Sequence, residues 1–171
     1  MQERTGVLTM GGNPVTLLGN EVKVGDKAPG FTAMDQDMKP FRFSELAGKV
    51  VILSAVTSLD TGTCDVETRR FNTEAGSLGD DVVILTISMD LPFAQKRWCG
   101  AAGVDKVKVV SDYMAAEFGQ KYGVLIKEVH LLARSIFVID RDGTVKYTQM
   151  VSENGDEPDY EPVIEAAREL M

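Results

Sequence analysis

The 171-residue chain is poor in the residues from which metal sites and disulfide scaffolds are built, with two cysteines and one histidine. Two cysteines are too few for a secreted disulfide framework, and Cys64 and Cys99 are 35 positions apart, which excludes a CxxC motif. A closed zinc site needs four ligands, and His130 is the single histidine that could join the two thiols. We therefore expect no metal ion and no other cofactor.

Positive charge and long apolar runs are also scarce. The chain has 18 Lys and Arg and 26 Asp and Glu, which gives a net charge of −8. No segment forms the basic stripe that nucleic acid binding requires. No stretch reaches the roughly 20 apolar residues of a membrane span, and the start, MQERTGVLTMGGNP, lacks the apolar core of a secretory signal. We expect a cytoplasmic protein without nucleic acid or membrane partners.

The apolar residues that are present, 44% of the chain, are enough for one substantial core, so we expect a single domain over residues 1–171. Three mostly continuous apolar runs, Val50–Val56, Val82–Ser88 and Val107–Val110, are typical of buried parallel strands, and each precedes a helical pattern. This alternation predicts an α/β sheet covered on both faces.

The two ends of the chain add hairpins and a helix to this pattern. Thr5–Met10 and Val15–Leu18 flank a Gly-Gly-Asn turn and predict an N-terminal β-hairpin. Ser135–Ile139 and Val145–Met150 flank an Arg-Asp-Gly turn and predict a second hairpin, and Tyr160–Met171 predicts a closing amphipathic helix. The sum fits a thioredoxin-like fold with an N-terminal β-hairpin.

Cys64 follows the first of these strands, at the predicted start of a helix. Asp60 and Thr61 are candidate caps for a helix from about Thr63, which places Cys64 in the first turn. There the unpaired N–H groups and the helix dipole favour a thiolate. A single cysteine is more often a small buried hydrophobe, but the Thr61 hydroxyl can turn back toward this sulfur. We interpret Cys64 as a candidate nucleophile.

Cys99 lies in a second predicted helix, Leu91–Ala102, for which Asp90 is the expected cap and Pro92 lies in the first turn. Structural disulfides rarely persist in a reducing cytosol, so a cysteine pair there is better explained as a redox couple. Two unrelated buried thiols remain the alternative.

Two segments resemble a known family. SLDTGTC, Ser58 to Cys64, resembles the peroxidatic loop of the peroxiredoxins, in which threonine or serine stands three residues before the reactive cysteine. SMDLPFAQKRWCGAAG, Ser88 to Gly103, resembles the resolving-cysteine helix of the thiol peroxidase subfamily, the atypical two-cysteine peroxiredoxins of bacteria. GNPVTLLG, LLARSIFVID and EPDYEPVI extend the resemblance over nearly the whole chain.

This resemblance implies a homodimeric peroxidase that reduces hydrogen peroxide and organic hydroperoxides with thioredoxin as the reductant. It implies that Cys64 becomes a sulfenic acid and that Cys99 then condenses with it to an intrachain disulfide. Thr61 would orient the peroxide, although plain helix capping also explains it. Arg134, before the strand SIFVID, would hold the thiolate, although a strand-end charge reaching water is the alternative.

Forming that disulfide requires the two Cα atoms within roughly 7 Å, which cysteines on separate helices do not normally satisfy. At least one helix must therefore unwind locally, and Gly62, Gly100 and Gly103 lower the cost of doing so.

One position departs from the family pattern, because Thr57 stands where the family has proline. We expect a site that is in place but slower than a proline-bearing version. The competing hypothesis, from another functional class, is a catalytically impaired, redox-responsive binding module. A general disulfide oxidoreductase is disfavoured because the chain has no CxxC motif.

Overall fold

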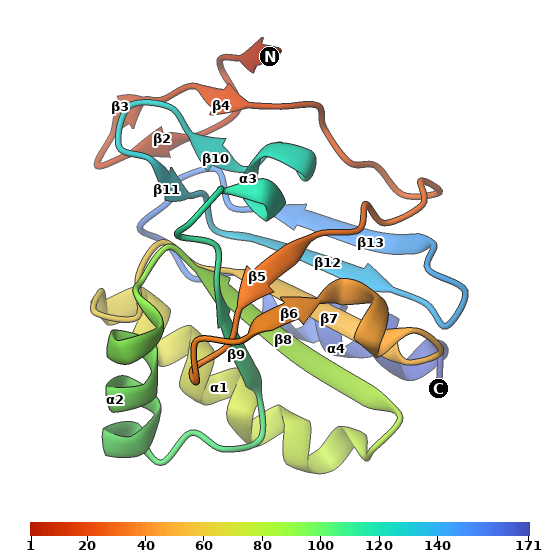
Figure 1. Cartoon of the computed structure of the whole chain (residues 1–171). Helices are drawn as coiled ribbons and strands as arrows, with labels where there is room; N and C mark the ends of the chain where they lie inside the picture. The colour runs from red at the N-terminus through yellow and green to blue at the C-terminus, as the bar shows by residue number, and fades with distance from the viewer.

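The computed structural model describes residues 1–171 and is built on a seven-stranded sheet (Figure 1). Its strand order is β13-β12-β7-β8-β9-β5-β6. The strands are β5 (Thr32–Met34), β6 (Pro40–Arg42), β7 (Val50–Ala55), β8 (Val82–Ser88), β9 (Lys108–Ser111), β12 (Ser135–Ile139) and β13 (Val145–Met150). β7, β8 and β9 are parallel, and the other pairings are antiparallel. The mixed α/β fold predicted from the sequence is confirmed.

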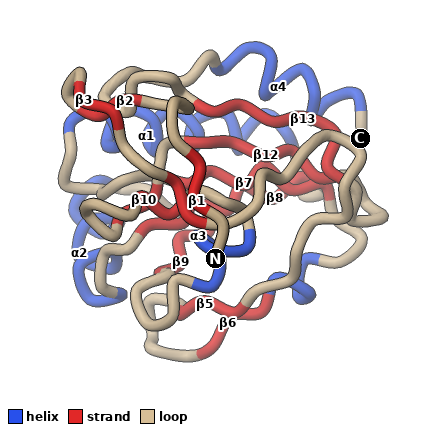
Figure 2. Tube along the Cα trace, turned by 90° about the horizontal axis from the view of Figure 1, so that it is seen from above, coloured by secondary structure: helices blue, strands red, loops and turns tan.

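The central strands are apolar on both sides because both faces of the sheet are covered. Along β7, Val50 and Ile52 belong to one buried cluster, whereas Val51 and Leu53 belong to another, as the period of two requires. The helices α1 (Gly62–Leu78), α2 (Pro92–Ala102) and α4 (Tyr160–Glu169) contribute to the first cluster. The second is covered by the N-terminal segments and α3 (Glu117–Lys121), on the other side of the sheet in Figure 1. Figure 2 shows α4 running alongside β12 and β13.

The N-terminal hairpin is present, but its second strand lies before the predicted Val15–Leu18, of which Leu17 and Leu18 pair in another sheet. β2 (Thr9–Met10) pairs with β3 (Asn13–Pro14) around Gly11 and Gly12, which both have positive φ. A separate four-stranded sheet has the order β1-β4-β10-β11, from Glu3–Arg4, Leu17–Leu18, Leu125–Ile126 and Leu131–Leu132. The hairpin and this four-stranded sheet both lie over the second cluster.

One predicted helix cap is wrong, and the start of another helix depends on a buried carboxylate. Helix α3 begins at Glu117, after the left-handed Ala116, and the Asp112 carboxylate accepts the N–H groups of Phe118 and Gly119. Burial of this carboxylate raises the pKa of Asp112 to about 6, and those two N–H bonds oppose the rise. At α2 the expected Asp90 cap is wrong, because Leu91 is the N-cap and the Asp90 side chain turns elsewhere.

None of the helices is long and apolar enough to cross a membrane. A short 3-10 helix, Phe43–Leu46, connects β6 to β7.

Candidate active site

Cys64 lies in the first turn of α1, as predicted, and its side chain is fully buried. Thr61 is the N-cap residue, and its hydroxyl accepts from the Cys64 N–H at 3.4 Å and donates to the Ser58 carbonyl at 2.9 Å. Both bonds are to backbone groups, so the capping role of Thr61 is confirmed. The N–H groups of Gly62 and Thr63 donate to no acceptor in the chain, which leaves two donors at the helix start.

Arg134 brings a cation to the Cys64 sulfur from the residue before β12. Its Nη1 lies 3.0 Å from Cys64 Sγ and 2.6 Å from Glu67 Oε2. The Arg134 side chain is only 2% exposed, so the alternative of a charge reaching water is wrong. Burial acts to lower the pKa of Arg134, but the Coulombic attraction of Cys64 and Glu67 and its hydrogen bonds to them outweigh it and raise the pKa. The guanidinium is therefore a fixed positive charge against the thiol.

Glu67 completes this buried group and was not predicted from the sequence. Its carboxylate accepts from Arg134 and also from the Ser54 hydroxyl at 3.2 Å. Burial raises the pKa of Glu67 to about 7, although the charge of Arg134 acts to lower it. The available signal was helical spacing, since Glu67 lies three residues after Cys64 and shares its buried face with Phe71.

Asn154 connects Arg134 to the unusual residue Thr57. The Asn154 side chain accepts the Arg134 N–H at 2.7 Å and donates to Thr57 Oγ1 at 2.7 Å, and its carbonyl accepts Arg134 Nε–H at 3.1 Å. The Thr57 hydroxyl donates in turn to the Leu132 carbonyl at 3.0 Å. Thr57 and Asn154 are both buried. No sequence signal identified Asn154, because the direction of a side chain in a loop depends on tertiary contacts.

Cys99 lies in α2, and the structure does not bring its sulfur to Cys64. Both cysteines are free, and Cys99 Sγ accepts from Gln36 Nε2 at 3.5 Å. Burial raises the pKa of the Cys99 thiol, and the Gln36 bond opposes this rise. A cavity of about 310 Å³ beside Cys99 is lined by Gln36 and its neighbours and by residues of the α2–β9 connection. The two thiols share one apolar cluster but contact different polar partners.

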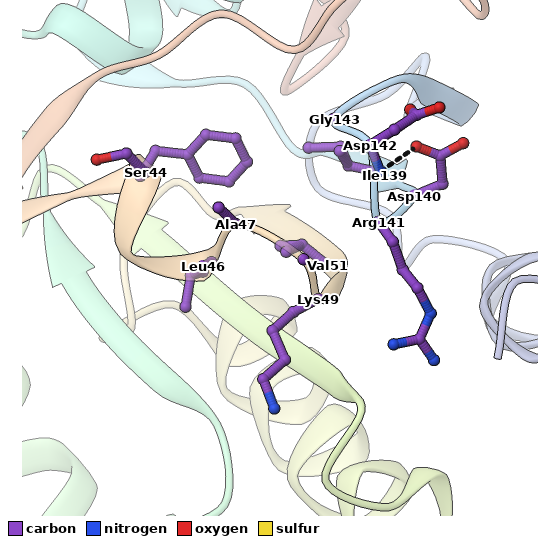
Figure 3. Close-up of a pocket in the computed structure, with 12 residues that line it drawn as sticks. Ser44, Leu46, Ala47, Lys49, Val51, Ile139, Asp140, Arg141, Asp142 and Gly143 are labelled. Carbon is purple, nitrogen blue, oxygen red and sulfur yellow. Dashed lines mark hydrogen bonds between the residues drawn. The ribbon is translucent and has the colours of Figure 1, made fainter.

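The pocket shown in Figure 3 contains neither Cys64 nor Cys99. It includes Lys49 and Val51 at the start of β7 and Ile139 at the end of β12, whereas Cys64 follows the end of β7 and Arg134 precedes β12. Since β7 and β12 are antiparallel, this pocket of about 170 Å³ lies at the opposite end of the strands from the thiol. It contains none of the predicted site residues.

A buried thiol at a helix start, held by a buried guanidinium on a thioredoxin-like sheet, defines a thiol-based redox protein. Known proteins narrow this class. The family model described as Redoxin matches residues 23–164. The thiol peroxidases of Bacillus subtilis and Halalkalibacterium halodurans are each 54% identical to the chain over 164 residues, covering 96% of it and 98% of theirs.

Solved structures agree with these matches. A peroxiredoxin-like protein from Aquifex aeolicus has a TM-score of 0.91 and 40% identity, and the match covers 98% of both chains. A thiol peroxidase from Chromobacterium violaceum, at 18% identity, shares the fold with a TM-score of 0.84 over 95% of each chain. The chain belongs to the Redoxin family and, within it, to the thiol peroxidase subfamily of the peroxiredoxins.

Proposed function

We propose that this peroxiredoxin is a peroxidase that reduces hydrogen peroxide and organic hydroperoxides with Cys64 as its nucleophile. The observation that carries the proposal is the 3.0 Å contact between Arg134 Nη1 and Cys64 Sγ in a buried environment. A neighbouring cation stabilises the thiolate, which is the reactive form of cysteine. Burial strengthens this electrostatic effect because little water screens it.

In the first step the Cys64 thiolate attacks one peroxide oxygen, and the O–O bond breaks. The sulfur is oxidised to sulfenic acid, and the other oxygen leaves as an alcohol or water after taking a proton. Negative charge grows on that leaving oxygen, and fixed donors lower the barrier. Arg134 and the unpaired N–H groups of Gly62 and Thr63 are suitable donors. Thr61 fixes the first turn of the helix and orients the peroxide.

In the second step the Cys99 thiol attacks the sulfenic sulfur, a disulfide forms and water leaves. A dithiol reductant, for which we propose thioredoxin, then restores both thiols while it becomes a disulfide itself. Because the two sulfurs contact different partners in the folded protein, this step requires local unwinding at α1 or α2.

Treatment of the reduced protein with one equivalent of peroxide tests the cycle. We expect both thiols to disappear and one intrachain disulfide to form, seen as a loss of two hydrogens by mass spectrometry. Cys99→Ser should consume one equivalent and stop at the sulfenic acid, and Cys64→Ser should consume none. Full turnover by Cys64→Ser would overturn the proposal.

The impaired binding module remains the competing function, and the geometry gives it little support. The Thr57 departure leaves the contact between Arg134 and Cys64 intact. Peroxide consumption by the reduced protein separates the two functions, since a binding module would not turn over.

From the family resemblance we also propose a cytoplasmic location and a homodimer, and sedimentation velocity tests the latter. The two apolar clusters on either side of one sheet support our proposal of a single domain over residues 1–171.

A further inference from the structure

Asp90, the residue expected to cap α2, instead binds the loop that precedes Cys64. Its carboxylate accepts from the Ser58 hydroxyl at 2.7 Å and from the Leu59 N–H at 2.8 Å. A third bond comes from the Ser88 hydroxyl at 2.7 Å. All three donors are neutral, and no cation forms an ion pair with Asp90. The carboxylate is therefore held by the loop and by the end of β8.

The same group of bonds extends into the helix that carries Cys99. Gln95 Nε2 donates to the Ser88 hydroxyl at 3.0 Å and to the Val110 carbonyl at 2.8 Å, and both Gln95 and Ser88 are buried. Gln95 lies one turn before Cys99 on α2. The backbone carbonyl of Asp90 also accepts a hydrogen bond from the Ser111 hydroxyl of β9. Asp90 and Ser88 thus join the loop before one cysteine to the helix of the other.

Ser58 connects the Asp90 carboxylate to the first turn of α1. Its carbonyl accepts from the Thr61 N–H at 3.1 Å and from the Thr61 hydroxyl at 2.9 Å, and Thr61 in turn caps the Cys64 N–H. If Ser58 is displaced, Thr61 loses two hydrogen bonds, and the cap that keeps Cys64 in the helix weakens. The position of Cys64 therefore depends on Asp90 through Ser58 and Thr61.

We propose that Asp90 is a positioning residue that holds the folded, peroxide-reactive arrangement of Cys64 and thereby sets the balance between peroxide attack and disulfide formation. The proposal rests on the proposed two-step cycle. Peroxide attack requires Cys64 beside Arg134, whereas disulfide formation requires Cys64 or Cys99 to leave its helix. Loosening the loop therefore slows the first step and accelerates the second.

Asp90→Ala is the main test, with the two steps followed separately by stopped flow. The single tryptophan, Trp98, is next to Cys99 and is the fluorescence reporter for disulfide formation, while peroxide consumption follows the oxidation step. We expect the ratio of the disulfide-forming rate to the oxidation rate to rise about tenfold, because hydrogen bonds to a charged group are lost. Mass spectrometry after excess peroxide gives a second measurement, since faster disulfide formation leaves less sulfinic acid at Cys64.

Two variants control for this change. Asp90→Asn should retain most of the wild-type ratio. Its amide oxygen can accept from the Leu59 N–H, and its NH₂ group can donate to the oxygen of the Ser58 hydroxyl. Asp60→Ala removes the same charge from the same loop, but the Asp60 side chain is exposed and makes no hydrogen bond or ion pair. It should leave the ratio of the two rates near the wild-type value.

The outcomes separate this inference from the function on which it rests. If the wild-type protein forms no disulfide between Cys64 and Cys99, the proposed cycle itself fails. If the wild-type protein cycles but Asp90→Ala leaves the ratio unchanged or lowers it, the positioning role of Asp90 is overturned. Should Asp90→Ala fail to fold, Ser58→Ala removes one of the three donors and should raise the ratio by a smaller factor. An unchanged ratio in that variant also counts against the inference.

Discussion

The guanidinium of Arg134 divides its contacts between a thiol and a carboxylate that are both buried. Removing it would leave Glu67 without its charged partner and Cys64 without its cation. A buried charge that loses its partner is far more costly than an exposed one. Arg134 therefore belongs to both the chemistry and the stability of the site, and a single substitution tests both.

We predict that Arg134→Ala slows Cys64 oxidation at neutral pH by about 10- to 100-fold, because one charge-assisted contact is worth roughly 1.5 to 3 kcal/mol. The rise of the rate with pH should also move to more alkaline pH, since the thiolate loses its stabilising charge. Stopped-flow oxidation between pH 5 and 9 measures both effects. Arg134→Lys, which keeps the charge but not the planar geometry, should retain part of the rate. An unchanged pH profile would assign Arg134 a structural role only.

The Thr57 hydroxyl makes two buried hydrogen bonds that proline cannot make. Proline would remove the hydroxyl that binds the Leu132 carbonyl and the Asn154 amide, and would leave the amide buried without an acceptor. We now predict that Thr57→Pro destabilises the protein by about 1 to 3 kcal/mol and does not accelerate Cys64 oxidation. Thr57→Ser, which keeps the hydroxyl, is the matched control for urea unfolding and stopped flow. Faster Cys64 oxidation by Thr57→Pro would instead mean that threonine at this position impairs the site.

At the scale of elements, the regular patterns of the sequence predicted most of the fold. The apolar run Val50–Val56 matches β7, and the run Val82–Ser88 matches β8 at both ends, because buried parallel strands are continuous in hydrophobicity. Cys64 could be proposed from its place at a helix start, and Arg134 from the family resemblance together with its place before an apolar strand. These signals are local, or nearly so.

The remaining site residues depend on tertiary contacts that local rules do not contain. Asp90 has the right type and position for a helix cap, but the Ser58 and Leu59 donors compete for its carboxylate and bind it. Asn154 occupies a loop whose path is determined by the N-terminal hairpin, since the Asn154 N–H donates to the Thr9 carbonyl. Neither contact has a sequence signature.

Helix α2 offers a direct test of local unwinding. Gly100 follows Cys99 on an exposed position of the helix, and a methyl group there would meet no atom within 4 Å. Gly100→Ala should stabilise the helix by roughly 0.5 to 1 kcal/mol and slow disulfide formation by about two- to fivefold, while peroxide attack stays unchanged. Gly30→Ala, at an equally open position outside the helices, is the control. If unwinding of α1 alone limits the step, Gly100→Ala will have no effect.

At the scale of the whole molecule, the burial of Glu67 makes the stability of the protein depend on pH. Its pKa is raised from 4.5 to about 7, so between these values the folded protein holds a proton that the unfolded chain has released. The unfolding free energy attributable to Glu67 therefore falls as pH rises through this window, by at most about 3 kcal/mol, and is constant above it. Asp112, with a pKa raised to about 6, contributes a slope of the same sign.

The difference between wild type and Glu67→Gln isolates the part due to Glu67. We predict that the unfolding free energy of Glu67→Gln, relative to wild type, rises between about pH 4.5 and 7, because the amide cannot release a proton. Urea unfolding of the reduced proteins at pH 5, 6, 7 and 8 measures this difference. Glu161→Gln, at a carboxylate that is 82% exposed, should show little change with pH. A difference that stays flat across the window would mean that Arg134 keeps Glu67 ionised in the folded protein, with attraction outweighing burial.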